Sequence, residues 1–257
     1  MSKTEQKNNV NSKIQPKKKG EKLLLHACCG PCSLEPYRIL KEQGWEITIF
    51  YSNDNIFPEE EFYKRWNELE KWASSNNIKV VKDYYDNQNW QNSVGKMPES
   101  KQNTKSRKTR CGACYFLRLE KAAKYAKDND IKYISSTLAV SPYQYNDILE
   151  EKLKQISDKH SLKYVFFDFR PYYSKATKKS IELNMYRQKY CGCEFSLNES
   201  IEQQTNLLKI KEQKKIKHEK ELLEAKIKNE KIKIHQLKKK KQKELIKQYK
   251  NSNKNNS

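Results

Sequence analysis

The sequence lacks any long hydrophobic run. No stretch of about 18 consecutive apolar residues, the length that a membrane-spanning helix requires, occurs in its 257 residues, so we expect no membrane span. The first 22 residues are rich in Lys and Asn and contain no apolar segment, which argues against a secretory signal. These absences and an odd number of cysteines favour a cytoplasmic protein, where closely spaced cysteines serve metal binding or catalysis more often than structural disulfides.

The positive charge of the chain is concentrated at its two ends. The formal net charge is +21, of which residues 201–257 contribute +11 through 18 Lys and 7 Glu, and residues 1–22 contribute +5. Residues 23–200 are therefore only mildly basic. Such a balance favours a polyanionic partner, with nucleic acid as the first candidate. The alternative is that the two charged ends are solvated tails without a binding role, and that their charge reflects a proteome rich in Lys and Asn.

Short apolar runs alternate with helical patterns through the central part of the chain. This alternation predicts an α/β domain with a mostly parallel, helix-covered sheet of the doubly wound, Rossmann-like type. In such sheets ligands bind beyond the carboxyl ends of the strands, and the first cysteines directly follow the first predicted strand. The predicted strands are residues 23–27, 46–51, 78–81, 132–138 and 164–168, and the predicted helices are residues 34–43, 58–75, 113–128, 144–157 and 175–183.

Composition divides the chain into three regions. Residues 1–21 are polar and aperiodic and are expected to be a disordered basic arm. Residues 22–199 are expected to be one α/β domain, large enough to bury a hydrophobic core without stabilising disulfides or metal ions. Residues 200–257 contain neither Pro nor Gly and are expected to be a Lys-rich helical extension that fades into disorder. That extension is either a partner-binding or RNA-tracking helix, or a marginally stable, solvated one.

The seven cysteines fall into three groups. Thiols that only fill a core are scattered singly, whereas adjacent, CxxC and CxC spacings allow thiolates to converge on one metal or to exchange one disulfide. About 80 residues separate one group from the next, so the fold must bring them together. The groups are Cys28, Cys29 and Cys32, then Cys111 and Cys114, and finally Cys191 and Cys193.

The first two groups together suit metal binding. Cys111 and Cys114 precede a predicted helix, whose dipole would lower the pKa of their thiols. Four cysteines can hold a structural zinc or an iron–sulfur cluster, and a redox disulfide is the remaining alternative. The cysteines lie at the end of a predicted strand, in a domain large enough to fold without a stabilising metal ion. This position disfavours a structural zinc. The third group, Cys191-Gly192-Cys193, suits a strained, readily reduced disulfide, with further metal ligation as its alternative.

Other polar and aromatic residues accompany the cysteines. His26 is either a ligand or proton donor, or a core histidine with satisfied hydrogen bonds. Asp168 and Arg170 are either site residues or a simple ion pair. A mixture of aromatic and cationic residues beside the cysteines suits recognition of a nucleic-acid base, although helix packing would explain some of them. These residues are Tyr115, Arg118, Tyr186, Arg187, Gln188 and Tyr190.

Six segments in this order carry a family resemblance. The chain resembles the QueH family of cobalamin-independent epoxyqueuosine reductases from about Leu23 to Leu197, and both charged extensions lie outside the resemblance. The segments are LLLHACCGPCS, YSNDNIFPEEEFYKR, RCGACYFLRLEKAA, STLAVSPYQ, FDFRPYY and MYRQKYCGCEFS.

The resemblance implies a reaction, a cofactor and a division of roles. The reaction is the last step of queuosine biosynthesis, a two-electron reduction of epoxyqueuosine to queuosine at the wobble position of tRNAs with a GUN anticodon, and an unidentified electron donor supplies the electrons. Residues 22–199 would then form a catalytic iron–sulfur domain with a second iron nearby, to which Cys32 is a candidate ligand. The implied [4Fe–4S] ligands are Cys28, Cys29, Cys111 and Cys114, and the implied redox-active disulfide pair is Cys191 and Cys193.

The basic residues before the CxxC pair are expected to contact the RNA. Arg107, Lys108 and Arg110 are placed to hold phosphates of the anticodon stem, and a solvated loop is the alternative. Two other function classes compete with the reductase. A zinc-stabilised RNA-binding protein would not explain why CxC and CC spacings join one site. A tRNA thiolation enzyme would show a phosphate loop such as SGGxDS after the first strand, where this chain has CCGPCS.

Overall fold

We analysed a computed structural model of the chain, which describes residues 18–97 and 104–254, with Thr104 and residues 247–254 described by their backbone alone. The chain forms two compact units that divide between Asn198 and Glu199. Most of the predicted N-terminal arm, residues 1–17, lies outside the described residues.

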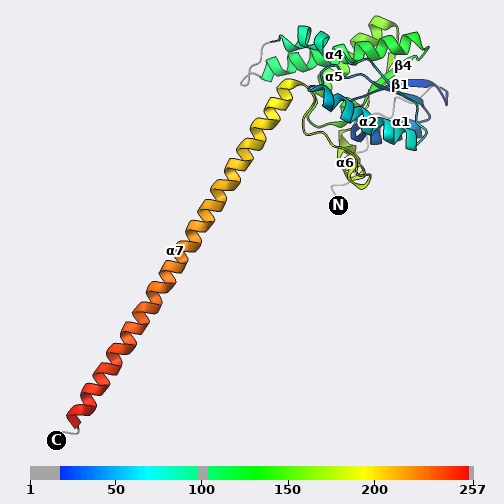
Figure 1. The fold of residues 1–257 in the computed structure, drawn as a ribbon. Coiled ribbons are helices and arrows are strands. Elements are labelled where there is room, and N and C mark those ends of the chain that lie inside the picture. The colour runs from blue at the N-terminus through cyan, green and yellow to red at the C-terminus, as the bar shows by residue number, and fades with distance from the viewer. Residues whose placement is uncertain (1–17, 98–103, 255–257) are drawn as a thin grey trace, which may run out of the picture. The chain divides into compact units, whose positions relative to one another are not determined.

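The first unit is built on a five-stranded, all-parallel sheet, which confirms the predicted fold class. Its strand order is β3-β2-β1-β4-β5, so the chain winds outward from β1 in both directions (Figure 1). The central strand is completely buried at Leu23, Leu24 and Leu25. The strands are β1 (Lys22–Ala27), β2 (Glu46–Tyr51), β3 (Val80–Lys82), β4 (Tyr133–Ser136) and β5 (Lys163–Tyr164).

Helices cover both faces of this sheet. α1 packs against α2 and α6, and α4 packs against α5 (Figure 1). The helices are α1 (Gly30–Glu42), α2 (Glu59–Ser75), α3 (Asn87–Trp90), α4 (Thr104–Asp128), α5 (Asn146–His160) and α6 (Tyr173–Glu182). Short irregular helices, η1 (Gln91–Gly95), η2 (Thr137–Val140) and η3 (Arg170–Tyr172), lie in the connections.

Two predicted helices begin earlier than expected, and both changes affect the cysteines. α1 begins at Gly30 rather than near residue 34, because the Cys29 sulfur caps it by accepting a hydrogen bond from the Cys32 backbone N–H. α4 begins at Thr104 rather than near residue 113, since the polar run before the CxxC contains good helix formers and no Pro or Gly. The CxxC pair therefore lies inside a helix and not at its start.

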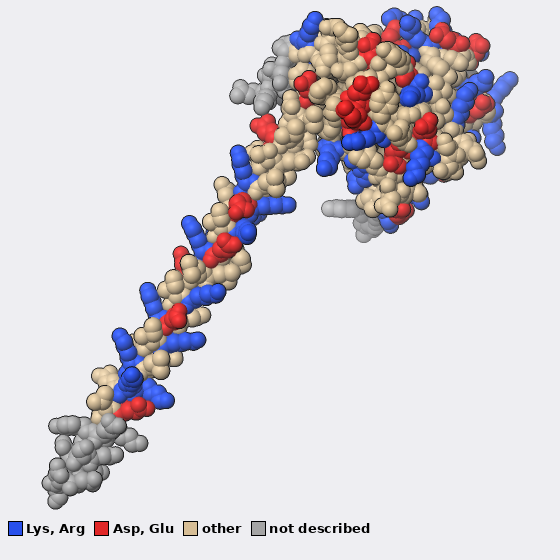
Figure 2. Space-filling view, viewed as in Figure 1, with Lys and Arg blue, Asp and Glu red and all other residues tan. Residues whose placement is uncertain are grey.

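The second unit continues a single helix. α7 runs over Glu194–Lys254, and its residues 201–246 are all exposed, including Leu208 and Leu223. Lys side chains project along the visible face of this helix (Figure 2). No helix in the described part of the chain is both long and apolar enough to cross a bilayer.

Candidate functional site

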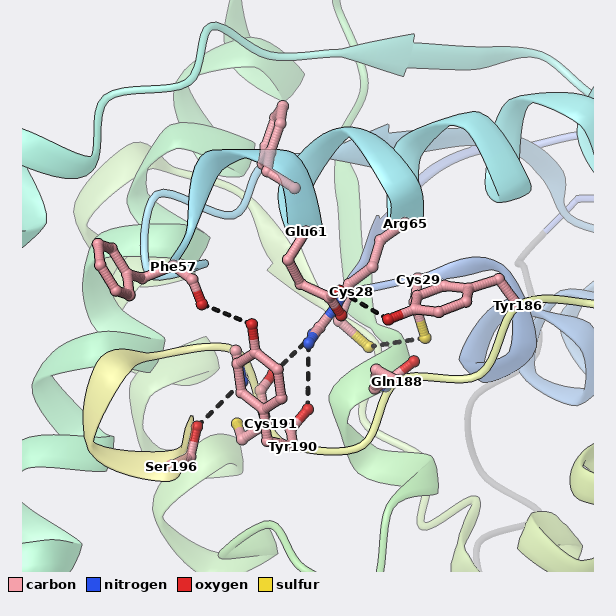
Figure 3. A network of polar contacts seen from close by, with 12 residues as sticks. Cys28, Cys29, Phe57, Glu61, Arg65, Tyr186, Gln188, Tyr190, Cys191 and Ser196 are labelled. Atoms are coloured by element: carbon pink, nitrogen blue, oxygen red, sulfur yellow. Dashed lines mark hydrogen bonds and ion pairs between the residues drawn. The ribbon is translucent and has the colours of Figure 1, made fainter. Parts of the chain in front are cut away.

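The first cysteine group lies at the carboxyl end of the central strand. Cys28 and Cys29 join β1 to α1, and Cys32 lies in the first turn of that helix. The three Sγ atoms all lie within 4.8 Å of one another, and those of Cys28 and Cys29 are 3.8 Å apart (Figure 3). Cys29 is 1% exposed and Cys28 7% exposed, so these two cysteines are nearly closed to water, whereas Cys32 is half-buried.

The protonation of these three thiols is uneven. Hydrogen bonds with the Cys29 and Cys32 side chains hold the pKa of Cys28 well below its usual range. Burial raises the pKa of Cys29, and hydrogen bonds with the Cys28 and Cys29 side chains raise the pKa of Cys32. Three soft sulfur donors, one of them with a lowered pKa, fit the ligand set of an iron–sulfur cluster or a thiolate-bound metal ion.

The second group lies in the interior of α4. Cys111 and Cys114 follow the first residue of the helix by two turns, so the dipole effect predicted for them is wrong, since it fades after the first turn. Burial instead raises the pKa of both thiols to about 12. Cys114 packs with Trp90, Val94 and Cys193, which joins the second group to the third.

The third group is the most accessible of the three. Cys191 is exposed and Cys193 is half-buried, and all seven cysteines are free thiols. The Gln144 side chain donates from Nε2 to the Cys191 sulfur at 3.4 Å. Its Oε1 accepts a hydrogen bond from the buried Tyr115 hydroxyl at 2.7 Å, which fixes Gln144 in this position.

A buried guanidinium group, Arg118, lies among all three groups. It is 2% exposed and donates from Nη2 to the Asn53 side-chain oxygen. Burial alone would lower its pKa, but the sulfurs of Cys114, Cys28 and Cys191 outweigh burial and raise it. No ion pair between described residues includes Arg118, so the sulfurs, and not a carboxylate, are the groups that raise its pKa.

A second buried guanidinium group holds the CxC segment in place. Arg65 pairs with Glu61 on α2, from Nε to Oε1 at 2.8 Å. It also donates to the backbone carbonyls of Cys191 at 2.8 Å and Tyr190 at 3.1 Å (Figure 3). Tyr186 donates to the other oxygen of Glu61 at 2.6 Å. These bonds fasten the last cysteine group to the helix that follows β2.

Gly192 fits this arrangement because it has no side chain. Its φ of +145° lies in the region that favours glycine. A Cβ here would lie 2.7 Å from Asn55 Nδ2, 3.1 Å from Ile56 Cγ1 and 3.3 Å from Arg65 Nη1. The glycine predicted to allow a strained disulfide therefore also permits a close approach to the loop after β2.

His26 has the structural role and not the ligand role. It is fully buried, and its Nε2 donates to the Ser52 carbonyl at 3.0 Å while Nδ1 lies 2.9 Å from the Ser136 hydroxyl. Burial lowers its pKa to about 3, so the ring is neutral and both nitrogens are satisfied. Asp168 and Arg170 likewise form an ion pair with each other at 2.5 Å.

The three predicted RNA-contacting residues separate in the structure. Arg107 and Lys108 are exposed on the first turns of α4, and Lys108 lies 5.4 Å from the centre of the Tyr145 ring. Arg110 is 5% exposed and stacks over the Phe195 ring at 4.0 Å. The surface role predicted for Arg110 does not fit its burial, because its guanidinium group packs inside the unit.

The sequence patterns assign no role to Arg65, Asn53 or Gln144. The YSNDN and EEEFYKR segments, which contain Asn53 and Arg65, were noted only for the family resemblance. The i, i+4 spacing of Glu61 and Arg65 is the one local pattern that could have indicated their ion pair. Five of the six residues expected near a base have other partners. Tyr115 is buried under Gln144, Gln188 donates to the Cys32 sulfur at 3.7 Å, and Tyr190 donates to the Phe57 carbonyl at 2.5 Å. Arg118 and Tyr186 bind Asn53 and Glu61, as described above.

The fold and the site together define a class. This is a doubly wound α/β protein that gathers thiols and two buried cations at the ligand-binding edge of its sheet, as expected of a thiol-dependent metal or redox enzyme. The family model described as "Epoxyqueuosine reductase QueH" matches residues 23–199. The chain belongs to the QueH family of epoxyqueuosine reductases, and it is an oxidoreductase of queuosine biosynthesis that modifies tRNA.

Individual relatives agree with the family model. The epoxyqueuosine reductase QueH of Acinetobacter baylyi is 32% identical over 188 residues, which cover 70% of this chain and 82% of that protein. The QueH of Thermotoga maritima is 30% identical over 190 residues, which cover 72% and 95% of the two chains. Among solved structures, the U34-tRNA thiolase NcsA of Methanococcus maripaludis with its [4Fe-4S] cluster aligns with a TM-score of 0.47 and 15% identity, over 75% of this chain and 68% of that one.

Proposed function

We propose that the three cysteine groups divide the work of epoxyqueuosine reduction. Cys28, Cys29, Cys111 and Cys114 hold a [4Fe–4S] cluster, Cys32 is a ligand of a second iron, and Cys191 with Cys193 exchanges electrons. The observation that carries this proposal is the group of three sulfurs within 4.8 Å of one another at the end of the central strand, together with the packing of Cys114 and Cys193 in one cluster. When bound, the iron–sulfur group supplies low-potential electrons and a Lewis acid.

The Cys191 and Cys193 thiols match the stoichiometry of the reaction. Removing the epoxide oxygen as water and leaving an alkene requires two electrons and two protons. Oxidation of two thiols to one disulfide releases the same number of each, so one epoxide and two thiols give one alkene, one water and one disulfide. A separate two-electron donor must then reduce the disulfide. The exposure of Cys191 supports both its access to the substrate and its reduction by a partner.

The substrate is a tRNA with a GUN anticodon that carries epoxyqueuosine. An anticodon loop presents unpaired bases, which enter a protein site without melting a duplex. Arg107 and Lys108 lie on the exposed side of the helix that carries Cys111, and the charge of Arg107 acts on that cysteine. Phosphates of the anticodon stem are therefore expected to lie next to the thiols.

Iron content tests the cofactor assignment directly. Protein purified without oxygen is expected to be brown, to absorb broadly at about 400 nm and to contain several irons per chain. Colourless protein that holds a single zinc would contradict the proposal and favour the zinc-stabilised RNA-binding alternative.

The roles of the cysteines are separable by substitution. C111A is expected to lose iron and activity together, whereas C193A is expected to keep its iron and leave epoxyqueuosine unreduced in tRNA from a host without its own reductase. Iron analysis and nucleoside mass spectrometry give the two readouts. C191A should behave as C193A does, and normal queuosine in either strain would remove that pair from the mechanism.

Burial predicts different outcomes for two of the basic residues. K108Q is expected to weaken tRNA binding and to reduce the salt slope of log K by about one unit, with no change in thermal stability. R110Q is expected to lower the free energy of unfolding by about 1–2 kcal/mol, because it removes a buried cation–π contact. Filter binding over a salt series and thermal melts measure the two effects. An equal salt-slope change for R110Q would show that this side chain does reach RNA.

A further inference from the structure

The turn that approaches Cys191 is held rigidly. Residues 141–145 connect η2 to α5, and within them the Gln144 backbone N–H donates to the Ser141 carbonyl at 3.3 Å. The buried Tyr115 hydroxyl contacts both the Gln144 side chain at 2.7 Å and the Tyr145 backbone N–H at 3.2 Å. Because Gln144 also contacts the Cys191 sulfur, this turn forms one wall beside the exposed thiol.

The same turn presents an aromatic ring to solvent. Tyr143 precedes Gln144 and is 76% exposed, whereas Tyr115 is 2% exposed. The Tyr143 ring meets Tyr173 edge-on, with centroids 6.4 Å apart and an interplanar angle of 88°. Such a contact orients the ring and leaves most of its surface open. An exposed side chain in a fixed position next to a reactive thiol is suited to contact the substrate.

Cationic side chains lie against the turn and on the segment that carries the thiol. Lys108 contacts the Tyr145 ring of the same turn, at 5.4 Å from its centre. On the segment that leads to Cys191, Arg187 and Lys189 are exposed. A flat aromatic surface among cations is the pattern by which proteins bind single-stranded nucleic acid, since the rings stack on bases and the cations contact phosphates.

We propose that Tyr143 is the stacking platform for an unpaired RNA base next to the nucleotide that reacts beside Cys191. This inference rests on the proposed function, because that function makes an anticodon loop the substrate. Gln144 faces the thiol and Tyr143 faces solvent, so the two neighbouring side chains hold two neighbouring positions of the RNA. Tyr143 therefore acts in binding and orientation and takes no part in electron transfer.

The test compares Y143A and Y143F with the wild-type holoenzyme. For an anticodon stem-loop of epoxyqueuosine-containing tRNA, Y143A is expected to raise Kd and KM about tenfold with little change in kcat, because stacking is worth about 1–3 kcal/mol per base. Y143F keeps the ring and is expected to bind as the wild type does. The tenfold ratio should be the same at low and high salt, whereas the ratio for K108Q should shrink as salt rises.

A matched control is available in Tyr84, which is 80% exposed and follows β3. Y84A is expected to leave Kd unchanged, and an equal loss for Y84A would overturn the proposal. Wild-type-like Kd and KM for Y143A, in a holoenzyme that reduces epoxyqueuosine, would also overturn it while the proposed function stands. A wild-type holoenzyme that binds the RNA but leaves epoxyqueuosine intact would instead overturn the proposed function.

Discussion

Replacing Arg118 by methionine is expected to lower the iron content of the site and to make the metal-free protein less stable than the wild type. The guanidinium group is buried among sulfurs of all three cysteine groups, and its hydrogen-bond acceptor on the loop after β2 is the uncharged side-chain oxygen of Asn53. An anionic thiolate-bound cluster needs this positive charge. Loss of a side chain that supports metal ligands lowers metal affinity by about 10- to 100-fold.

The stability of the metal-free protein should fall as well. The sulfurs around Arg118 hold its pKa above the ordinary value, so the folded protein favours this cation. Leaving the Asn53 oxygen without its donor costs about a further 1 kcal/mol. We therefore expect R118M to melt below the wild-type temperature when free of metal.

Iron and sulfide analysis after anaerobic reconstitution, together with thermal melts of the metal-free proteins, test both parts. R118K keeps the positive charge but loses the planar guanidinium group with its several N–H donors. This variant should retain an intermediate amount of iron. R38M is the control: Arg38 forms ion pairs with Glu35 and Glu42 on α1 and should alter stability by less than about 1 kcal/mol. Full iron content in R118M would show that the sulfurs do not depend on this charge.

Gly192→Ala is expected to abolish most of the activity by displacing the CxC segment. The new Cβ would have to occupy a left-handed backbone region, which costs about 1–3 kcal/mol, and would press on Asn55 and Arg65. Overpacking adds about 1–3 kcal/mol. If the segment moves by about 1 Å in response, the reaction slows by roughly 100-fold.

Two measurements separate displacement from general unfolding. In G192A, thiol labelling at Cys191 should be faster while the iron content stays close to that of the wild type. G20A is the matched control, because Gly20 also has a positive φ, of +88°, but no atom lies within 4 Å of the position that its Cβ would take. It should show the backbone cost alone and keep full activity. Wild-type activity in G192A would mean that the segment does not need its present position.

The sheet was predictable where burial alone determines the strands. β1 and β2 occupy the predicted positions within one residue. Their continuous apolar runs are stable only where both faces of the strand are buried, and that condition places them in the centre of the sheet. The predicted strand at residues 164–168 keeps a ladder only at Lys163–Tyr164, since β5 is an edge strand. In its buried continuation the Val165 backbone N–H still donates to the Ile134 carbonyl of β4 at 2.8 Å, and Phe166 is buried without belonging to a strand.

The site was predictable in its cysteines and not in its cations. Spacing in the sequence identifies the thiols, because short intervals place two sulfurs together. Arg65 and Arg118 act through tertiary contacts with segments about 60 to 125 residues away, which no local pattern reports. Arg110 shows the same limit, since its place in a basic run suggested exposure while Phe195 covers it.

The way Arg65 holds the CxC segment also bears on how this enzyme can diverge. Its two bonds go to main-chain carbonyls, those of Tyr190 and Cys191, which every amino acid possesses. The exposed neighbour Arg187 can therefore be exchanged without loosening the attachment. Natural variation or a mutant library at this position should change the surface beside Cys191 while the backbone of the segment keeps its place, so the segment separates what can evolve from what is held constant.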